Sequence, residues 1–163
     1  MSQSMRPKIL ILYYSRHGAT KALANKIALG IEQAGLEACL RTVPEITTQL
    51  GDTQEAVPNN GDPYVSHQDL VECAGLALGS PTRFGNMAAP LKYFLEQTTA
   101  SWVNGQMVGK PATLFTSTTT PHGGQESTLL SMMNPLLSSA KTWKISSRAR
   151  SSASYGSYCY SSW

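Results

Sequence analysis

The chain has 163 residues, of which 41% are hydrophobic and 14% are charged, which is typical of one globular domain with a sizeable core. No segment approaches the roughly 18 consecutive apolar residues of a membrane span, and residues 1–7 lack the apolar stretch of a secretory signal. We therefore expect a cytoplasmic protein without a membrane span. Cys39, Cys73 and Cys159 are odd in number and form no CxxC pair, which favours buried or incidental thiols over disulfides or a metal site.

The net charge of +3 is distributed unevenly along the chain. Residues 1–137 carry nine Lys or Arg and ten Asp or Glu, whereas residues 138–163 carry four basic residues and no acidic one. The main body is therefore close to neutral and has no basic stripe, and the sequence has no helix-turn-helix or zinc-finger spacing. We expect no nucleic-acid partner.

The first half of the chain alternates between strand and helix patterns. Residues 8–14 form a short apolar run, typical of a parallel strand that is buried on both faces. Residues 20–34 have apolar side chains at spacings of three and four, which predicts a helix that ends at Gly35. Residues 37–43 are predicted to form a second strand, which Pro44 ends.

Residues 44–68 show no sustained period and are predicted to form a long surface loop, with a contact between subunits as an alternative role. A short helix over 68–73 and a third buried strand over 74–79 follow.

The next predicted helix carries Leu91 and Phe94 on its apolar side, with Asn86 as its cap and Pro90 in its first turn. A fourth strand over 111–117 and a helix over 129–137, limited or kinked by Pro135, complete the pattern. This alternation predicts an α/β fold, with a doubly wound parallel sheet and helices on both faces.

Residues 138–163 break this pattern, because ten of these 26 residues are Ser and no apolar period remains. We therefore predict a domain over 1–137, followed by an atypical Ser-rich tail that is out of frame or disordered. The tail is expected to form no buried strand in register with the fourth strand, which leaves apolar surface of the body exposed. A divergent tail that folds over the edge of the sheet is the alternative.

Ligands of open parallel sheets bind beyond the carboxyl ends of the strands, where this chain has three unusual loops. Residues 15–20, SRHGAT, place hydroxyls and a glycine at the start of the first helix, where unpaired N–H groups and the helix dipole favour a phosphate. Ordinary helix capping is the alternative. No GxxxxGK[ST] or GxGxxG motif is present, so a mononucleotide phosphate is favoured.

The loops after the third and fourth predicted strands are similarly distinctive. Residues 80–87, SPTRFGNM, combine turn residues with a guanidinium and an aromatic ring, and can run beside a planar heterocycle. Residues 116–126, TSTTTPHGGQE, are rich in hydroxyls and glycines, with a polar loop that binds nothing as the alternative. No GxSxG nucleophile elbow accompanies them, so hydrolysis is not supported.

Together, these three loops resemble those of the flavodoxin-like NAD(P)H:quinone oxidoreductases related to the tryptophan-repressor-binding protein (WrbA-like), and the resemblance covers about residues 8–137. It implies a flavodoxin-like sheet of order 2-1-3-4-5, FMN as cofactor, a homotetramer, and two-electron reduction of quinones by NADH or NADPH through flavin N5. The fifth strand and last helix of that fold have no matching sequence here. The flavin carries the chemistry, so no catalytic side chain is expected.

The resemblance also implies which residues form the site. His17 would approach the nicotinamide nucleotide, Trp102 would cover the quinone, and Thr20 would present both its hydroxyl and its N–H to the phosphate. A surface or interface packing residue is the alternative for Trp102. The residues matched to FMN binding are Ser15, Arg16, His17, Gly18, Ala19 and Thr20 in the first loop, Pro81, Thr82, Arg83, Phe84, Gly85 and Asn86 in the second, and Ser117, Thr118, Thr119, Thr120 and Gly123 in the third.

Two other functions remain open at this point. One is an electron-transferring flavodoxin that does not use NAD(P)H, although the near-neutral body differs from the strongly acidic surface typical of such carriers. The other is an FMN-binding regulatory protein whose catalysis is impaired by the altered C-terminus.

Overall fold

The computed structural model of the chain describes residues 6–46, 61–137, 144–145, 148–152 and 157–161, and only the backbone of the last three segments. Strands and helices alternate through the body, as predicted, with boundaries within a few residues of those expected. A short helix, α4, is an addition to the predicted set. The elements of the body are β1 (Lys8–Tyr13), α1 (Ala19–Gln33), β2 (Glu37–Thr42), α2 (His67–Glu72), β3 (Gly75–Pro81), α3 (Ala89–Gln97), α4 (Thr99–Val103), β4 (Pro111–Ser117) and α5 (Gln125–Leu137).

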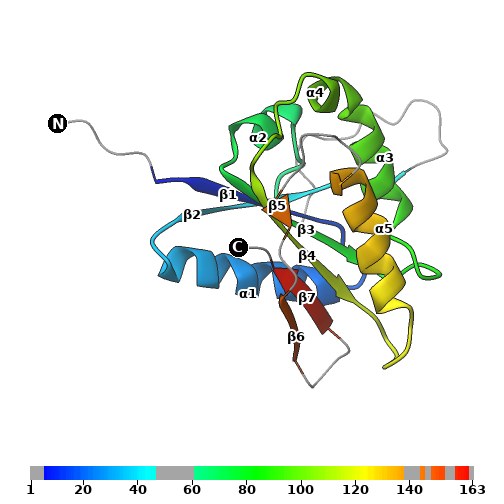
Figure 1. Cartoon of the computed structure of the whole chain (residues 1–163). Coiled ribbons are helices and arrows are strands. Elements are labelled where there is room, and N and C mark those ends of the chain that lie inside the picture. Colours follow the sequence, from blue (N-terminus) through cyan, green and yellow to red (C-terminus); the bar gives the residue numbers. More distant parts are fainter. Residues whose placement is uncertain (1–5, 47–60, 138–143, 146–147, 153–156, 162–163) are drawn as a thin grey trace.

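The first four strands form a parallel sheet in the order β2-β1-β3-β4 (Figure 1). Leu10 of β1 lies in register with Cys39 of β2 on one side and Leu76 of β3 on the other. Leu78 of β3 pairs in turn with Leu114 of β4. Because all four strands run in one direction, their carboxyl ends meet at one edge of the sheet, where the three predicted loops begin.

Both faces of this sheet are covered, which explains why β1 is apolar throughout. Leu10 and Leu12 lie in the core cluster that contains residues of α2, α3 and α5. Ile11 and Tyr13 lie in a second cluster with residues of α1. Figure 1 shows α1 on the opposite side of the sheet from α3 and α5. Since successive side chains of a strand point to opposite faces, a strand between two helical layers needs apolar residues at every position. The predicted doubly wound α/β architecture is confirmed.

The ends of the helices follow the predicted signals in one case and depart from them in another. Gly35 ends α1 with φ of 80°, and Leu36 N–H donates to the Ile31 carbonyl, as in a Schellman motif. The prediction that Asn86 caps α3 is wrong, because the N-cap is Ala88. Asn86 forms a turn with Arg83 instead, which keeps it away from the start of the helix.

The backbone of the tail extends the sheet beyond β4. β5 (Lys144–Ile145) pairs in parallel with the first two residues of β4, and β7 (Ser157–Ser161) pairs with residues 114–116 of β4 in antiparallel orientation. β6 (Arg148–Ser152) then pairs with β7. The expectation was that the tail forms no buried strand in register with the fourth strand, and it stays a prediction because the burial of these strands lies outside the described residues. Main-chain pairing requires no particular side chain, so a Ser-rich segment can extend an unpaired sheet edge.

A parallel fifth strand longer than two residues is not present in the described backbone of the tail, so the parallel part of the sheet consists essentially of β1–β4. The side chains of residues 138–163 lie outside the described residues, and the burial of these strands lies outside them as well. The predicted domain boundary at residue 137 stays a prediction.

Asp69 anchors the chain where it re-enters the fold after the long loop. Its Oδ2 atom accepts hydrogen bonds from the N–H of Ser66 at 2.9 Å and from the Arg41 Nε at 3.3 Å, within a capping box at the start of α2. Burial by itself would raise the pKa of the Asp69 carboxyl, but the hydrogen bonds from Ser66 and the Arg41 guanidinium outweigh it and lower the pKa. The folded chain therefore holds Asp69 as a carboxylate.

We expect Asp69→Asn to lower the free energy of unfolding by about 1 kcal/mol at neutral pH, the usual loss for a helix cap. A carboxyl with a depressed pKa contributes stability above its unfolded pKa, and this contribution is lost as pH falls through the folded pKa. The difference between variant and wild type should therefore shrink in acid, as measured by urea denaturation from neutral pH to about pH 3. Glu72→Gln, at an exposed carboxylate of the same helix, is the control and should change stability by less than about 0.5 kcal/mol.

Candidate functional site

The first loop leaves the start of α1 open. Gly18 is the N-cap with φ of 87°, and no side chain caps the helix. A Cβ atom at Gly18 would meet nothing within 4 Å, so the backbone there is approachable, while the left-handed φ disfavours any other residue. Ser15 Oγ accepts the Gly18 N–H at 3.1 Å and fixes the loop. The N–H groups of the first helical turn, which lack intrahelical acceptors, are thus available to an anion.

The second loop is a tight turn with an aromatic side chain at its tip. The N–H groups of Arg83 and Asn86 donate to each other's carbonyls at 2.8 and 2.9 Å. Phe84, between them, has φ of 51° and a fully exposed ring. A non-glycine residue in the left-handed region is energetically costly and is frequently found at ligand sites. The turn therefore presents a flat apolar surface at the edge of the sheet.

The third loop folds back closely on itself. A Cβ atom at Gly123 would lie 2.0 Å from Thr118 Oγ1 and 2.6 Å from Thr120 Oγ1, so any larger residue there would displace these hydroxyls. Gln125, which is fully buried at the start of α5, donates through Nε2 to the Pro121 carbonyl. Its Oε1 has no hydrogen-bond partner among the described residues.

The three loops line one cavity of about 350 Å³ at the carboxyl ends of the strands, a volume within the range of small-molecule sites. Gly18, Gly85 and Asn86 are absent from the lining and shape the turns instead. The residues that line it are Ser15, Arg16, His17, Ala19, Thr20, Pro81, Thr82, Arg83, Phe84, Ser117, Thr118, Thr119, Thr120 and Gly123. The structure thus brings together the three groups of residues that the sequence separates by up to about a hundred positions.

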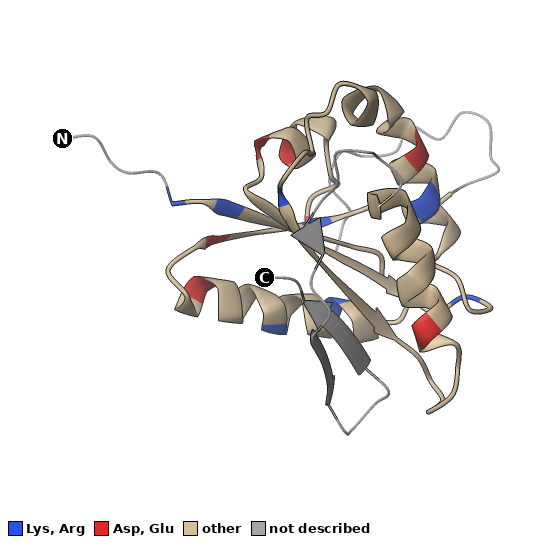
Figure 2. Cartoon of the chain, viewed as in Figure 1, with Lys and Arg blue, Asp and Glu red and all other residues tan. Residues whose placement is uncertain are grey.

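The cavity is electrostatically suited to an anion. Its lining includes two arginines and no carboxylate. Burial and the hydrogen bond to Glu45 raise the pKa of Tyr14, whereas the positive charges of Arg16 and Arg83 act in the opposite direction. Elsewhere, Figure 2 shows basic and acidic residues dispersed over the helices and strands of the described chain. The lining of this cavity thus carries positive charge without a counter-charge.

The Thr20 hydroxyl, which was expected to face the phosphate, is paired within the protein. Thr20 is only 1% exposed, and its Oγ1 lies 2.9 Å from Ser117 Oγ. Both residues line the cavity, so the contact of the hydroxyl with the phosphate stays a prediction. Its backbone N–H remains among the groups at the helix start that can bind an anion.

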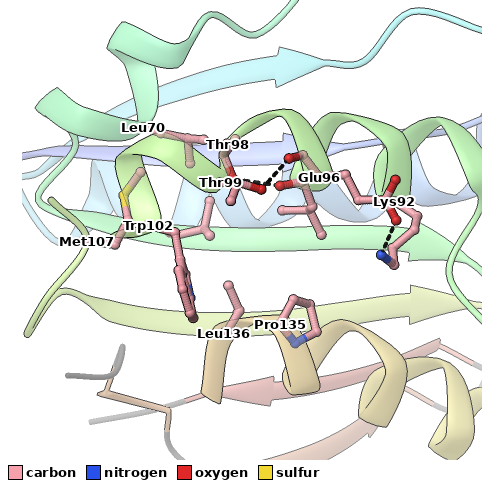
Figure 3. Close-up of a pocket in the computed structure, with 11 residues that line it drawn as sticks. Leu70, Lys92, Glu96, Thr98, Thr99, Trp102, Met107, Pro135 and Leu136 are labelled. Atoms are coloured by element: carbon pink, nitrogen blue, oxygen red, sulfur yellow. Dashed lines mark hydrogen bonds and ion pairs between the residues drawn. The ribbon is translucent and has the colours of Figure 1, made fainter. Parts of the chain in front are cut away.

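Trp102 lies away from this cavity. It is 40% exposed on α4 and lines a second cavity of about 260 Å³ between α4 and the end of α5, where Figure 3 shows its indole ring beside Leu136. Leu76, near the start of β3, lines this second cavity, whereas Pro81, at the end of β3, lines the first. Trp102 and the three loops are therefore at opposite ends of the sheet within one chain.

Several buried residues around the site were not among those predicted to bind FMN. Ser80, Thr116 and Thr128 are buried hydroxyl residues that link the second and third loops beneath the cavity. On the other face of the sheet, the Tyr13 hydroxyl donates to Asp62 Oδ2 at 2.5 Å and holds the end of the long loop beside α1. The sequence did offer a signal for such residues, namely a Ser or Thr within an apolar strand pattern. Because buried polar groups in proteins are hydrogen-bonded, such a residue is expected to have a partner inside the fold.

The parallel sheet and the loop at its first helix define a flavodoxin-like α/β protein with a cavity suited to an anion. Residues 7–153 match the model of the NADPH-dependent FMN reductase family, and the chain belongs to that family. No helix in the described ranges has the length and apolar character to cross a membrane.

Relatives of known name agree with this assignment. The chain is 41% identical over 125 residues to NAD(P)H dehydrogenase (quinone) 3 of Rhizobium meliloti, with coverage of 76% of this chain and 59% of the relative. It is 39% identical over 135 residues to NAD(P)H dehydrogenase (quinone) of Solidesulfovibrio magneticus, with coverage of 79% and 66%. The chain thus spans less than two thirds of the length of these relatives. The resemblance inferred from the three loops is confirmed.

A solved structure supports the fold alone. The flavodoxin, WrbA-like protein from Agrobacterium tumefaciens superposes with a TM-score of 0.60 at 19% identity, with coverage of 79% of this chain and 71% of that one.

The family and the fold indicate FMN as the cofactor, and the residues present fit it. A phosphate group requires donors without competing carboxylates, which the open backbone at Gly18 and the acid-free lining provide. A planar ring requires a flat apolar partner, which the exposed ring of Phe84 provides.

Proposed function

We propose that the chain binds FMN in the three-loop cavity and uses NADH or NADPH to reduce quinones. The observation that carries this proposal is the convergence of the phosphate-binding helix start, the Arg83–Asn86 turn and the glycine-rich third loop on one acid-free cavity. The printed names of the relatives, which are quinone dehydrogenases, support the same reaction class. When bound, FMN supplies the redox chemistry by carrying a hydride at N5 from the nicotinamide to the quinone.

In this proposal, the residues of the chain bind FMN and orient its ring. Ser15 and the N–H groups of residues 19 and 20 hold the phosphate, and residues 81–84 lie along the ring. The Arg83 guanidinium, which donates to the Thr82 carbonyl at 2.9 Å, keeps a positive charge at the cavity wall, where it favours negative charge on the reduced ring. His17 is exposed at the mouth of the cavity, where an incoming nucleotide passes.

The test is an absorption spectrum of the purified chain after addition of FMN and removal of the excess. Bound flavin should lose its visible absorbance when NADH or NADPH is added without oxygen, and a quinone should restore it. Retained FMN that stays oxidised with both nucleotides contradicts the reductase function and leaves an FMN-binding protein. Absence of retained FMN contradicts the site itself.

We further propose that the chain works as a homotetramer in which Trp102 of one copy covers the quinone site of another. Within one chain, Trp102 is at the opposite end of β3 from the cavity, so it cannot cover the flavin of its own copy. Around it, Tyr93, Val103 and Val108 are 55%, 68% and 44% exposed, which is typical of surface that a partner covers.

A mixed oligomer tests this arrangement. Trp102→Ala should raise the KM for quinone without weakening FMN binding, whereas Ala19→Glu, which places a carboxylate in the phosphate loop, should lose FMN. Copies of the two variants, co-expressed with different tags and purified together, should regain quinone reduction per bound flavin, because one copy supplies the indole and the other the flavin. No gain over Trp102→Ala alone would show that Trp102 does not act between copies.

A further inference from the structure

The three-loop cavity contains one histidine. The chain has three histidines, His17, His67 and His122, and all of them are exposed. His17 lines the cavity, whereas His122 lies on the third loop and is absent from the lining. His67 begins α2, where its ring meets the edge of the Phe94 ring with centroids 6.0 Å apart. Of the three, His17 is therefore the one placed to meet a molecule bound in the cavity.

His17 also differs in kind from the other side chains of the lining. Those are hydroxyls, two guanidiniums, one aromatic ring and small apolar groups. Ser and Thr hydroxyls are very weak acids, and a guanidinium is not deprotonated in proteins. Imidazole is the side-chain group that ordinarily gains and loses a proton between about pH 5 and 8. Among the described residues that line this cavity, His17 is thus the one that can deliver a proton near neutral pH.

The charged and titratable groups around His17 leave this proton to a bound molecule. They are Arg16 in the first loop, Arg83 in the second, His122 and Glu126 in and after the third, Lys21 of α1 with Asp62 at 3.9 Å, and Tyr14 after β1 with Glu45 at 3.1 Å. Burial and the hydrogen bond to Glu45 raise the pKa of Tyr14, so its hydroxyl keeps its own proton. The lining has no carboxylate that competes with a bound oxygen for the proton of His17.

We propose that His17 is the acid that protonates the quinone oxygen during reduction in this cavity. The inference rests on the proposed reductase function. Conversion of a quinone to a hydroquinone adds two electrons and two protons, and a hydride brings both electrons but only one of the protons. For the other, an N–H bond of the His17 imidazolium breaks and an O–H bond forms on the quinone oxygen. Because His17 is exposed, the neutral imidazole regains its proton from water.

This role is separable from the contact with the nicotinamide nucleotide that the resemblance implies for His17. Such a contact affects the bleaching of the flavin by NADH or NADPH, whereas the proposed proton transfer affects its reoxidation by a quinone. Ferricyanide accepts electrons without protons, so reoxidation by ferricyanide is independent of an acid. Single-turnover measurements of the two half-reactions therefore distinguish the two roles.

The first experiment is anaerobic stopped-flow reoxidation of the reduced, FMN-loaded full chain by 1,4-benzoquinone and by ferricyanide. His17→Gln should slow reoxidation by the quinone about 100-fold, the low end of the usual contribution of a general acid, because water partly replaces the imidazole at an exposed site. It should change reoxidation by ferricyanide by less than about twofold. His122→Gln, at the exposed histidine of the third loop, is the matched control and should behave as wild type with both acceptors.

The pH dependence follows from the protonated form being the donor. Reoxidation of the wild type by the quinone should become slower as pH rises from about 5 to 8, and His17→Gln should lack this dependence.

Proton uptake on binding provides a second readout that requires no turnover. The probe is 2-hydroxy-1,4-naphthoquinone, which is an anion at neutral pH with its charge shared by the quinone oxygens. Its binding beside His17 favours the imidazolium, because an opposite charge stabilises the charged form. Calorimetric titrations at about pH 8 in buffers of different ionisation enthalpy should show uptake of up to about one proton per site for the wild type and His122→Gln. His17→Gln should show none.

An unchanged rate with the quinone in His17→Gln would overturn the inference. Equal losses with quinone and ferricyanide would also overturn it, as would proton uptake equal to that of the wild type. His17→Asn, made in parallel, ensures that the result does not depend on the fold of one variant. Failure of the unmodified chain to retain FMN, or to bleach with either nucleotide, would instead contradict the proposed reductase function.

Discussion

Gly79→Ala is expected to lower the free energy of unfolding by about 1 to 3 kcal/mol, the usual effect of overpacking a well-packed core. Gly79 lies in the centre of β3, in register with Tyr13 on one side and Phe115 on the other. A Cβ atom there would lie 2.1 Å from the Cζ atom of Phe115. The Phe115 ring is 1% exposed within the cluster beneath α1, so it has no free space to move into.

Urea denaturation of the two proteins would measure this loss. Gly30→Ala is the matched control, since Gly30 lies within α1 and its Cβ would meet nothing within 4 Å. That substitution should raise stability by about 0.5 to 1 kcal/mol, because alanine is the better helix former. In the Gly79→Ala background, Phe115→Leu should recover part of the loss by making room. An unchanged denaturation midpoint for Gly79→Ala would contradict the packing described for this strand.

Ala19→Glu is expected to weaken FMN binding by about 100-fold or more, because it places a carboxylate a few ångströms from a phosphate dianion. Ala19 is the first residue of α1, is exposed, and lines the cavity. Riboflavin, which has no phosphate, should bind within about threefold of the wild-type affinity. The folded chain should not lose stability, because α1 has no acidic residue in its first turn and a carboxylate there is favourable by about 0.3 to 1 kcal/mol.

Fluorescence titration with both flavins and a thermal melt of the flavin-free protein would measure these effects. Ala22→Glu is the control, since Ala22 is exposed on the same helix but does not line the cavity. It should leave FMN affinity close to that of the wild type. Equal affinity of Ala19→Glu and Ala22→Glu for FMN would show that the phosphate does not bind at the start of α1.

The sequence alone determined the alternation of strands and helices, the layers and the three loops, because these depend on local patterns. A strand such as residues 8–13 shows its double burial in its own composition, and a helix such as α1 shows its apolar side in its spacing. The common position of the three loops follows from the rule that parallel strands present their carboxyl ends at one edge of the sheet. Their residues, from Ser15 to Gly123, were predicted to share one site, and most of them line one cavity.

Only the tertiary structure decided how individual groups are paired. The Thr20 hydroxyl turned to Ser117, Asn86 joined a turn instead of capping α3, and Trp102 came to the far end of the sheet from the loops. Each outcome depends on a partner that is remote in sequence or on the direction in which a helix meets the sheet. The same holds for the tail, whose backbone pairs with β4 although its side chains carry no strand pattern. Local periodicity reports which face of an element is buried, whereas the partner of a buried polar group or an open sheet edge is set by the distances that the whole fold imposes.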